Sequence, residues 1–329
     1  MGAKSILSLL LMAGLLVGCA SKQMTQRELL VQAVGFDGTL HYTLPLSDES
    51  ANKLDAQIAD AREDLKENPT DEMALIWYGR RLSYAGLYQQ AVVNYTRGLQ
   101  LHPDSFKLRR HRGHRFITLR LLRPALDDLA RAESLSRNIP NAVEPDGMPN
   151  AAGIPLSTTR GNILYHLALA YYLSGSYTDA ARTWQEALDI ARNDDSRVSC
   201  TYWLLLCEAK LDEKARVAEL LSTVTPDMSI LENDQYHQLL LYFKGDLAED
   251  VLLGNAAASG AVRSSATNSA TVLYGIGAWA LWNDQRARAA KMFREALLTP
   301  QWAAFGYIAA EAELAQMEGY WDRYKAATY

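Results

Sequence analysis

The sequence predicts an all-α protein built as a solenoid of antiparallel helix pairs, and three observations carry this prediction. Small and polar residues recur at a spacing of 34, which pairs Gly79 with Gly113, Ala91 with Ala125, and Asp104 with Asn138. The apolar residues between them follow the spacing of one helix face. The composition, 49% hydrophobic and 22% charged over 329 residues, supplies enough apolar material for a core. A repeat of this length is typical of stacked helical units.

Composition and charge exclude several classes of protein. The apolar content excludes a wholly disordered chain, and 10 prolines and 3 cysteines exclude collagen-like and disulfide-scaffold classes. A formal net charge of −5 argues against a general nucleic-acid binder, whose surface is basic. We therefore expect no nucleic-acid partner.

Residues 1–18 have the features of a bacterial lipoprotein signal peptide. Lys4 precedes an apolar run over 6–17 that is too short to span a bilayer. The run ends in Leu16-Val17-Gly18-Cys19, which resembles the lipobox of bacterial lipoproteins. This resemblance implies that the chain is cut before Cys19 and that the Cys19 thiol and the new amine receive acyl chains. An ordinary secretory signal with an incidental cysteine, or an uncleaved anchor, is the alternative.

The residues after Cys19 indicate where the protein would be anchored. Ala20 and Ser21 follow the cysteine, and neither is the aspartate that retains lipoproteins in the inner membrane. The resemblance thus implies the periplasmic face of the outer membrane, with the inner membrane less favoured. We expect residues 19–50 to form a lipidated tether, with a short extended piece near 40–44. A capping helix should follow over 51–67, between an N-cap at Asp48 or Ser50 and Asn68-Pro69.

The first repeat, over 72–105, shows the pattern most completely. Its marked positions are Leu75, Gly79, Leu82, Ala91, Tyr95 and Pro103. The small residues allow two helices to approach closely, the larger ones fill the space between them, and the proline ends the second helix. This pattern resembles the tetratricopeptide repeat (TPR), which implies a TPR-like α-solenoid with a right-handed superhelical path. A generic helical bundle with coincidental spacing is the alternative.

Three more repeats are expected along the chain, over 106–139, 161–194 and 270–303. The second departs from the pattern because Arg120 stands where the turn glycine belongs. A loop rich in proline and glycine is expected over 139–159. We predict irregular helical hairpins over 195–269, split near Pro226 and closed by a Gly/Ala/Ser-rich loop at 254–269. A capping helix over 302–324 completes the solenoid, which spans 51–329.

The TPR resemblance also implies which residues face the concave groove. In that family the first helix of each pair lines the groove at fixed positions. The matching residues include Arg80, Tyr84, Lys107, Arg110, His114, Tyr165, Tyr172, Tyr274 and Trp282. Positive charge at one end of the groove favours a carboxylate, because arginine presents a planar bidentate donor. The predicted partner is a protein or peptide, acidic or bound through its C-terminal carboxylate.

The basic run over 107–123 need not bind a peptide. The run is also consistent with a solvated helix balanced by Asp127, Asp128 and Glu133, which is the preferred interpretation. Contact with an anionic lipid or polysaccharide is a third interpretation. His111 and His114 have the spacing of metal ligands, but the flanking arginines oppose a divalent cation. We expect neither a metal nor another cofactor.

The sequence contains no Gly-x-Ser-x-Gly, His-Glu-x-x-His or glycine-rich phosphate loop. We therefore predict that the protein is not an enzyme, although a site hidden in 195–269 is a remote alternative. The predicted function is that of a membrane-anchored periplasmic TPR lipoprotein that acts as a protein-interaction adaptor or scaffold in the cell envelope. The competing interpretation is a structural, self-associating envelope component without a specific peptide ligand. The sequence leaves the partner and the oligomeric state open.

Overall fold

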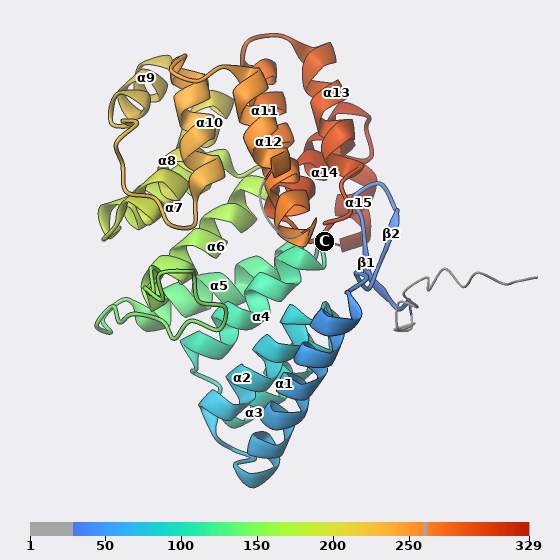
Figure 1. Ribbon diagram of the computed structural model, residues 1–329. Helices are drawn as coiled ribbons and strands as arrows, with labels where there is room; N and C mark the ends of the chain where they lie inside the picture. Colours follow the sequence, from blue (N-terminus) through green and yellow to red (C-terminus); the bar gives the residue numbers. More distant parts are fainter. Residues whose placement is uncertain (1–28, 259–261, 329) are drawn as a thin grey trace, which may run out of the picture.

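The chain folds as a TPR-like α-solenoid in which consecutive helices pack in antiparallel pairs (Figure 1). The computed structural model describes residues 29–258 and 262–328, so the predicted leader and Cys19 lie outside the described residues. The helices of the first half are α1 (Asp48–Glu67), α2 (Glu72–Tyr84), α3 (Tyr88–Leu101), α4 (Phe106–Thr118), α5 (Leu122–Ser136), α6 (Thr159–Leu173) and α7 (Tyr177–Asp189). Those of the second half are α8 (Asp194–Lys210), α9 (Lys214–Ser222), α10 (Asp234–Lys244), α11 (Glu249–Ala258), α12 (Val262–Trp282), α13 (Arg286–Leu297), α14 (Phe305–Met317) and α15 (Trp321–Thr328).

Small residues allow the two helices of a repeat to pack closely where they cross. A Cβ atom at Gly79 would lie 2.3 Å from the ring of Tyr95, and one at Gly113 would lie 2.6 Å from Leu129. A larger residue at either position would therefore force α2 from α3, or α4 from α5. Side-chain caps start the first helices, since Asp71 accepts from the Ala74 amide at 2.7 Å. Local sequence thus sets both the ends and the spacing of these helices.

The second half of the solenoid differs from expectation at two places. The Gly/Ala/Ser-rich stretch predicted as a loop over 254–269 is mostly helical, because α11 continues to Ala258 and α12 begins at Val262. Alanine is the strongest helix former, and Leu252, Ala256 and Ala266 are buried. The predicted terminal helix over 302–324 is two helices, α14 and α15, which the left-handed residue Gly319 (φ +80°) separates.

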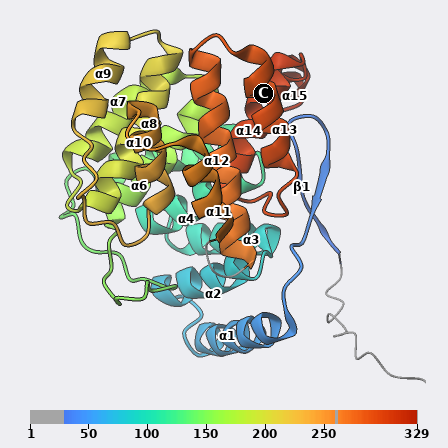
Figure 2. The ribbon, with the colours of Figure 1, turned by 45° about the horizontal axis from the view of Figure 1, so that its top comes forward.

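Part of the segment assigned to a tether is folded. Strands β1 (Val31–Val34) and β2 (Leu40–Tyr42) form an antiparallel hairpin beside α15 (Figure 2). Phe36, in the hairpin turn, is buried with its ring 5.2 Å from that of Trp321 and 4.7 Å from that of Tyr324. The extended piece expected near 40–44 is confirmed as β2, but the expectation of a tether reaching residue 50 was wrong for the hairpin, because the aromatic partners of Phe36 are nearly 300 positions away and no local pattern reveals them.

The solenoid closes on itself through Arg120. This residue is left-handed (φ 62°) at the turn of the second repeat, where Gly86 and Gly175 occupy the equivalent turns of the first and third. Its guanidinium is fully buried and donates to Glu311 of α14 at 2.8 Å and to the carbonyl of Trp302 at 2.9 Å. The backbone strain of a non-glycine residue is thus offset by a buried ion pair that joins the second repeat to the last one.

Among residues 29–258 and 262–328, no helix combines the length and the hydrophobicity that a membrane crossing requires.

Candidate functional site

Six basic side chains gather on the inner wall that α2, α4 and α6 form. This Arg–His cluster comprises Arg80, Arg110, His111, His114, Arg115 and His166. The helices pack side by side, so cations from three successive first helices come together. Such an accumulation of positive charge requires anions from elsewhere in the chain or from a ligand.

The loop over 139–159 supplies one carboxylate to the cluster. Glu144 accepts from Nη2 of Arg110 at 2.5 and 2.6 Å and from the Asn162 amide at 2.8 Å. Nε2 of His111 lies 3.6 Å from the same carboxylate. Arg110 is only 8% exposed and Glu144 only 9%, so this ion pair is shielded from water. The loop therefore acts as an internal ligand for Arg110.

The same loop also covers Arg80. Its guanidinium donates to the Pro145 carbonyl at 2.7 Å and to the Tyr84 hydroxyl at 3.1 Å, and it lies 4.4 Å from the Trp77 ring. A Cβ atom at Gly147 would lie 2.3 Å from the Tyr84 hydroxyl, so a side chain at this position would force Tyr84 to move. The insertion between the second and third repeats thus covers the end of the predicted groove.

Arg115 is a cluster cation whose guanidinium has no polar partner among the described residues. Among the described residues, no hydrogen bond and no ion pair involves its guanidinium, which lies 5.3 Å from the ring centroid of Tyr88. Burial lowers the pKa of Arg115, although an arginine stays charged at neutral pH. A desolvated charge without a counter-ion costs free energy that a bound anion would recover. The arrangement is suited to receive a carboxylate or another small anion.

The histidines of the cluster are held in the neutral form. Burial, followed by the positive charge of Arg110, lowers the pKa of His166 to about 3. Burial lowers the pKa of His111 and His114 well below 6.5, and Arg110 and Arg115 respectively lower it further. The ring of His114 lies 4.1 Å from that of His166 and 5.3 Å from that of Phe305. Neutral imidazoles can accept or donate a hydrogen bond without adding to the repulsion between the arginines.

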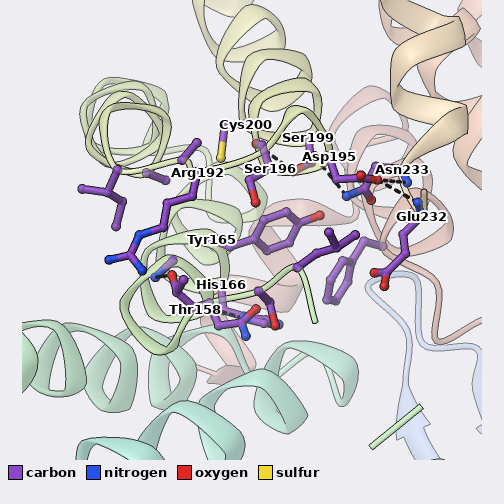
Figure 3. A pocket seen from close by; sticks show the side chains of 18 residues that line it. Thr158, Tyr165, His166, Arg192, Asp195, Ser196, Ser199, Cys200, Glu232 and Asn233 are labelled. Atoms are coloured by element: carbon purple, nitrogen blue, oxygen red, sulfur yellow. Dashed lines mark hydrogen bonds between the residues drawn. The ribbon is translucent and has the colours of Figure 1, made fainter. Parts of the chain in front are cut away.

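A pocket of about 260 Å³ adjoins the cluster across Asn162 and His166 (Figure 3). It lies between α6, the start of α8 and Phe305, and Tyr165 and Cys200 line it. Burial raises the pKa of the Cys200 thiol to about 12, so this cysteine is not a nucleophile. The volume suits one or two side chains of a partner rather than a folded domain.

One wall of the pocket is fixed by Asp195 at the start of α8. Its buried carboxylate accepts hydrogen bonds from the backbone amides of Leu231, Glu232 and Asn233, at distances of 2.7 to 3.2 Å. The pocket is therefore preorganised by the segment before α10, and Asp195 has its acceptor capacity occupied.

Some of the predicted groove residues lie at the Arg–His cluster or its adjoining pocket, and others lie elsewhere. Arg80, Tyr84, Arg110 and His114 meet in or beside the cluster, and Tyr165 lines the adjoining pocket. Lys107 is 42% exposed, and its Nζ lies 3.5 Å from Glu72.

Tyr172 and Tyr274 are not groove residues. Both are buried, and their hydroxyls are 2.6 Å apart in the core. The prediction was wrong for them because α12 packs against α8 and α10, which brings Tyr274 of α12 onto Tyr172 of α6. Trp282, also expected in the groove, lies beside Trp279, with ring centroids 4.7 Å apart.

Much of the remaining basic run is balanced internally. Asp128 accepts from Arg112 at 2.6 Å and from Arg109 at 3.1 Å, and Arg120 pairs with Glu311. The solvated-helix interpretation identified Asp128 as a counter-ion but did not anticipate Glu311.

Glu144 and His166 are candidate-site residues that the sequence did not reveal, and Arg115 was identified only as a member of the basic run over 107–123. Glu144 sits in a loop that the repeat pattern does not place, and Arg115 occupies a position that the TPR resemblance does not assign to the groove. A charged residue inside a loop of prolines and glycines was the available signal for Glu144.

Within the described ranges, no group of three or more His, Cys, Asp or Glu residues has a metal-binding arrangement.

No model of a known protein family and no curated protein sequence matches the chain. Among solved structures, the chain is similar to YrrB, described as a TPR protein with an unusual peptide-binding site, at 15% identity and a TM-score of 0.41, over 78% of this chain and 97% of that one. It is also similar to a tetratricopeptide repeat protein from Parabacteroides merdae, at 15% identity and a TM-score of 0.43, over 80% and 99%. The description of the fold therefore rests on the helix pairs themselves.

Proposed function

We propose that this protein is an interaction scaffold whose inner wall binds an anionic group of a protein or peptide partner. The observation that carries the proposal is Arg115, a partly buried guanidinium with no counter-ion among the described residues. Arg80, which has no carboxylate partner among the described residues, adds to the positive potential, and the adjoining pocket accepts a neighbouring side chain of the partner. The mechanism is preorganised binding, and the proposal includes no catalytic step.

Glu144 supports the choice of a carboxylate as the recognised group. The chain already places one carboxylate on Arg110, with Asn162 and His111 completing its surroundings. Arg115 offers a second cationic position on the same helix, α4, and the Tyr88 ring holds the flat guanidinium in place. A partner's carboxylate at Arg115 would thus extend an arrangement that the fold uses internally.

The location belongs to the same proposal. The lipobox-like Leu16–Cys19 supports lipidation of Cys19 and a position on the periplasmic face of the outer membrane. Several acyl chains would hold the protein firmly, because each buried methylene contributes about 0.8 kcal/mol. Partners are then proteins of the cell envelope.

The test is photo-crosslinking in intact cells from a probe at Tyr84, which lies beside Arg80. Crosslinked partners are compared between the parent, Arg115→Gln and Arg123→Gln, each carrying the probe. Arg123 is the matched control because it belongs to the same basic run but is 58% exposed on α5. We expect Arg115→Gln to lose the crosslinks and Arg123→Gln to keep them. Crosslinks that survive Arg115→Gln, or that lead only to a second copy of the chain, would contradict the proposal and favour a self-associating structural component.

A further inference from the structure

The hairpin has an apolar face that no described residue covers. In the β1–β2 register, Val31 lies opposite Tyr42 and Val34 opposite Leu40. These four side chains are 38% to 51% exposed, whereas Ala33 and His41, which pair on the other face, are buried. A two-stranded sheet with one buried face normally carries polar residues on its outer face. This hairpin carries valine, leucine and tyrosine there instead.

The apolar surface continues beyond the strands. Leu29 is 71% exposed and Leu30 is 41% exposed at the start of the hairpin. Beside β1, a groove of about 760 Å³ extends to Val93 of α3, Leu121 and Tyr320, all of which are exposed apolar residues. Contiguous apolar surface of this kind marks an interaction site on a folded protein. We call these exposed residues of the hairpin and groove the hairpin patch.

We propose that the hairpin patch rests on the lipid bilayer that anchors the chain. This inference rests on the proposed lipidation of Cys19. Leu29 follows Cys19 by ten positions, and such a segment spans at most about 35 Å when fully extended. Helix α1, with 20 residues, is itself about 30 Å long. The anchor therefore keeps the hairpin closer to the bilayer than the remainder of the solenoid.

An added β-strand from a protein partner is a poorer occupant of this surface. Gln89 donates through Nε2 to the carbonyls of Val31 and Gln32, at 3.2 and 2.8 Å, and Trp302 donates to the carbonyl of Tyr42 at 2.8 Å. These side chains occupy carbonyls that an incoming strand would need. A lipid surface needs no backbone hydrogen bonds and gains free energy from apolar burial alone.

The hairpin patch would give the solenoid a defined orientation on the membrane. A lipid anchor alone would not fix the orientation of the solenoid relative to the membrane. An anchor together with the hairpin patch holds one edge of the molecule at the bilayer and fixes the direction in which the inner wall faces.

The experiment places an environment-sensitive fluorophore at two matched positions of the full chain, isolated with its membranes or reconstituted into phosphatidylethanolamine/phosphatidylglycerol vesicles. Val34→Cys labels the hairpin patch. Val251→Cys on α11 is the control, because it replaces the same residue type at similar exposure, 46% against 51%, on a helix that packs on α10 and α12. Cys200 and Cys207 are buried and should not react in the folded protein.

We expect brominated lipids to quench most of the emission of the label at position 34 and to leave the label at position 251 unchanged. Equal and weak quenching at both positions, in protein that fractionates with membranes, would overturn the patch assignment. Efficient disulfide formation between two copies through Val34→Cys, without quenching by lipid, would overturn it in favour of a second copy. If the parent chain fractionates as Cys19→Ala does, outside the membranes, the proposed anchoring itself fails.

Discussion

At the residue scale, the Arg–His cluster combines permanent and titratable charge in one buried place. The arginines remain charged at any pH at which the protein folds, so the histidines must stay neutral to limit repulsion. The lowered pKa values of His111, His114 and His166 show that folding opposes their protonation. The cluster therefore makes stability depend on pH.

The first prediction concerns acidification. The pKa of His166 is about 3 in the folded protein and about 6.5 when unfolded, so the unfolded chain takes up the proton first as pH falls. The contribution of His166 to the free energy of unfolding is therefore fully present above pH 6.5. It declines as the pH falls below this value, by about 2 kcal/mol at pH 5. Thermal unfolding of the parent should show Tm falling between pH 7 and pH 5, and His166→Phe should reduce this fall. His102→Phe, outside the cluster, is the control, and an equal fall in all three proteins would refute the assignment.

At the scale of single elements, two segments with little regular structure determine the shape of the site. The hairpin joins α3 to the C-terminal helices α14 and α15, and the loop over 139–159 covers the Arg–His cluster. The sequence pattern indicated only connecting segments at both places. Each makes specific buried contacts that can be tested by mutation.

Phe36→Ala should destabilise the protein by about 3 to 5 kcal/mol, because a fully buried aromatic ring leaves a cavity beside Trp321 and Tyr324. Val34→Ala, a truncation two residues away at a 51% exposed position, should have little effect in detergent solution. Chemical unfolding of the three proteins provides the comparison. If Phe36→Ala unfolds at the same denaturant concentration as Val34→Ala, the segment is a tether after all.

Glu144→Ala should release the loop over 139–159, because it leaves Arg110 buried without its counter-ion at a cost of about 3 to 5 kcal/mol. Hydrogen exchange and limited proteolysis should both become faster within the loop. Asp146→Ala serves as the control, since among the described residues that exposed side chain bonds only the Met148 backbone amide, two residues away. Equal loop protection in the two variants would show that Glu144 does not hold the loop.

These elements also show what the sequence could and could not predict. The 34-residue spacing of Gly79 and Gly113 predicted the helix pairs because both glycines act within one repeat. Arg80, Arg110 and His114 were found because they occupy fixed positions of the repeat. Phe36 and Glu144 were not, because their environment comes from contacts between distant segments or from a loop without periodicity, and Arg115 was identified only as part of the basic run. Tyr172 was misplaced because α12 packs where an open groove was expected.

At the scale of the whole molecule, the solenoid is closed rather than open. Glu311 receives hydrogen bonds from both Arg120 and His41, at 2.8 and 2.9 Å, so one carboxylate joins the second repeat, the hairpin and α14. The Tyr324 hydroxyl adds a bond to the Arg120 carbonyl at 2.6 Å. These bonds hold the second repeat, the hairpin, α14 and α15 together.

Arg120→Gly tests this closure without adding backbone strain, because glycine tolerates the left-handed conformation at this turn. The backbone should gain about 1 kcal/mol, but the loss of the buried pair with Glu311 should cost about 3 to 5 kcal/mol. We expect a lower Tm and a larger radius of gyration by small-angle X-ray scattering. Arg123→Gly provides a comparison at an exposed ion pair. An unchanged radius of gyration in Arg120→Gly would show that closure does not depend on this pair.

The central claim is that the inner wall binds an anion at Arg115, and ligand-induced thermal stabilisation of the full chain measures this directly. The probes are a short glutamate peptide with a free C-terminal carboxylate and its amidated glutamine counterpart. A ligand at one hundred times its Kd stabilises the folded state by about 2.7 kcal/mol, so binding appears as a rise in Tm. We predict that the glutamate peptide stabilises the parent and Arg123→Gln but not Arg115→Gln, and that the glutamine peptide stabilises none of them. Equal stabilisation of Arg115→Gln and the parent, or none in the parent, would contradict the claim.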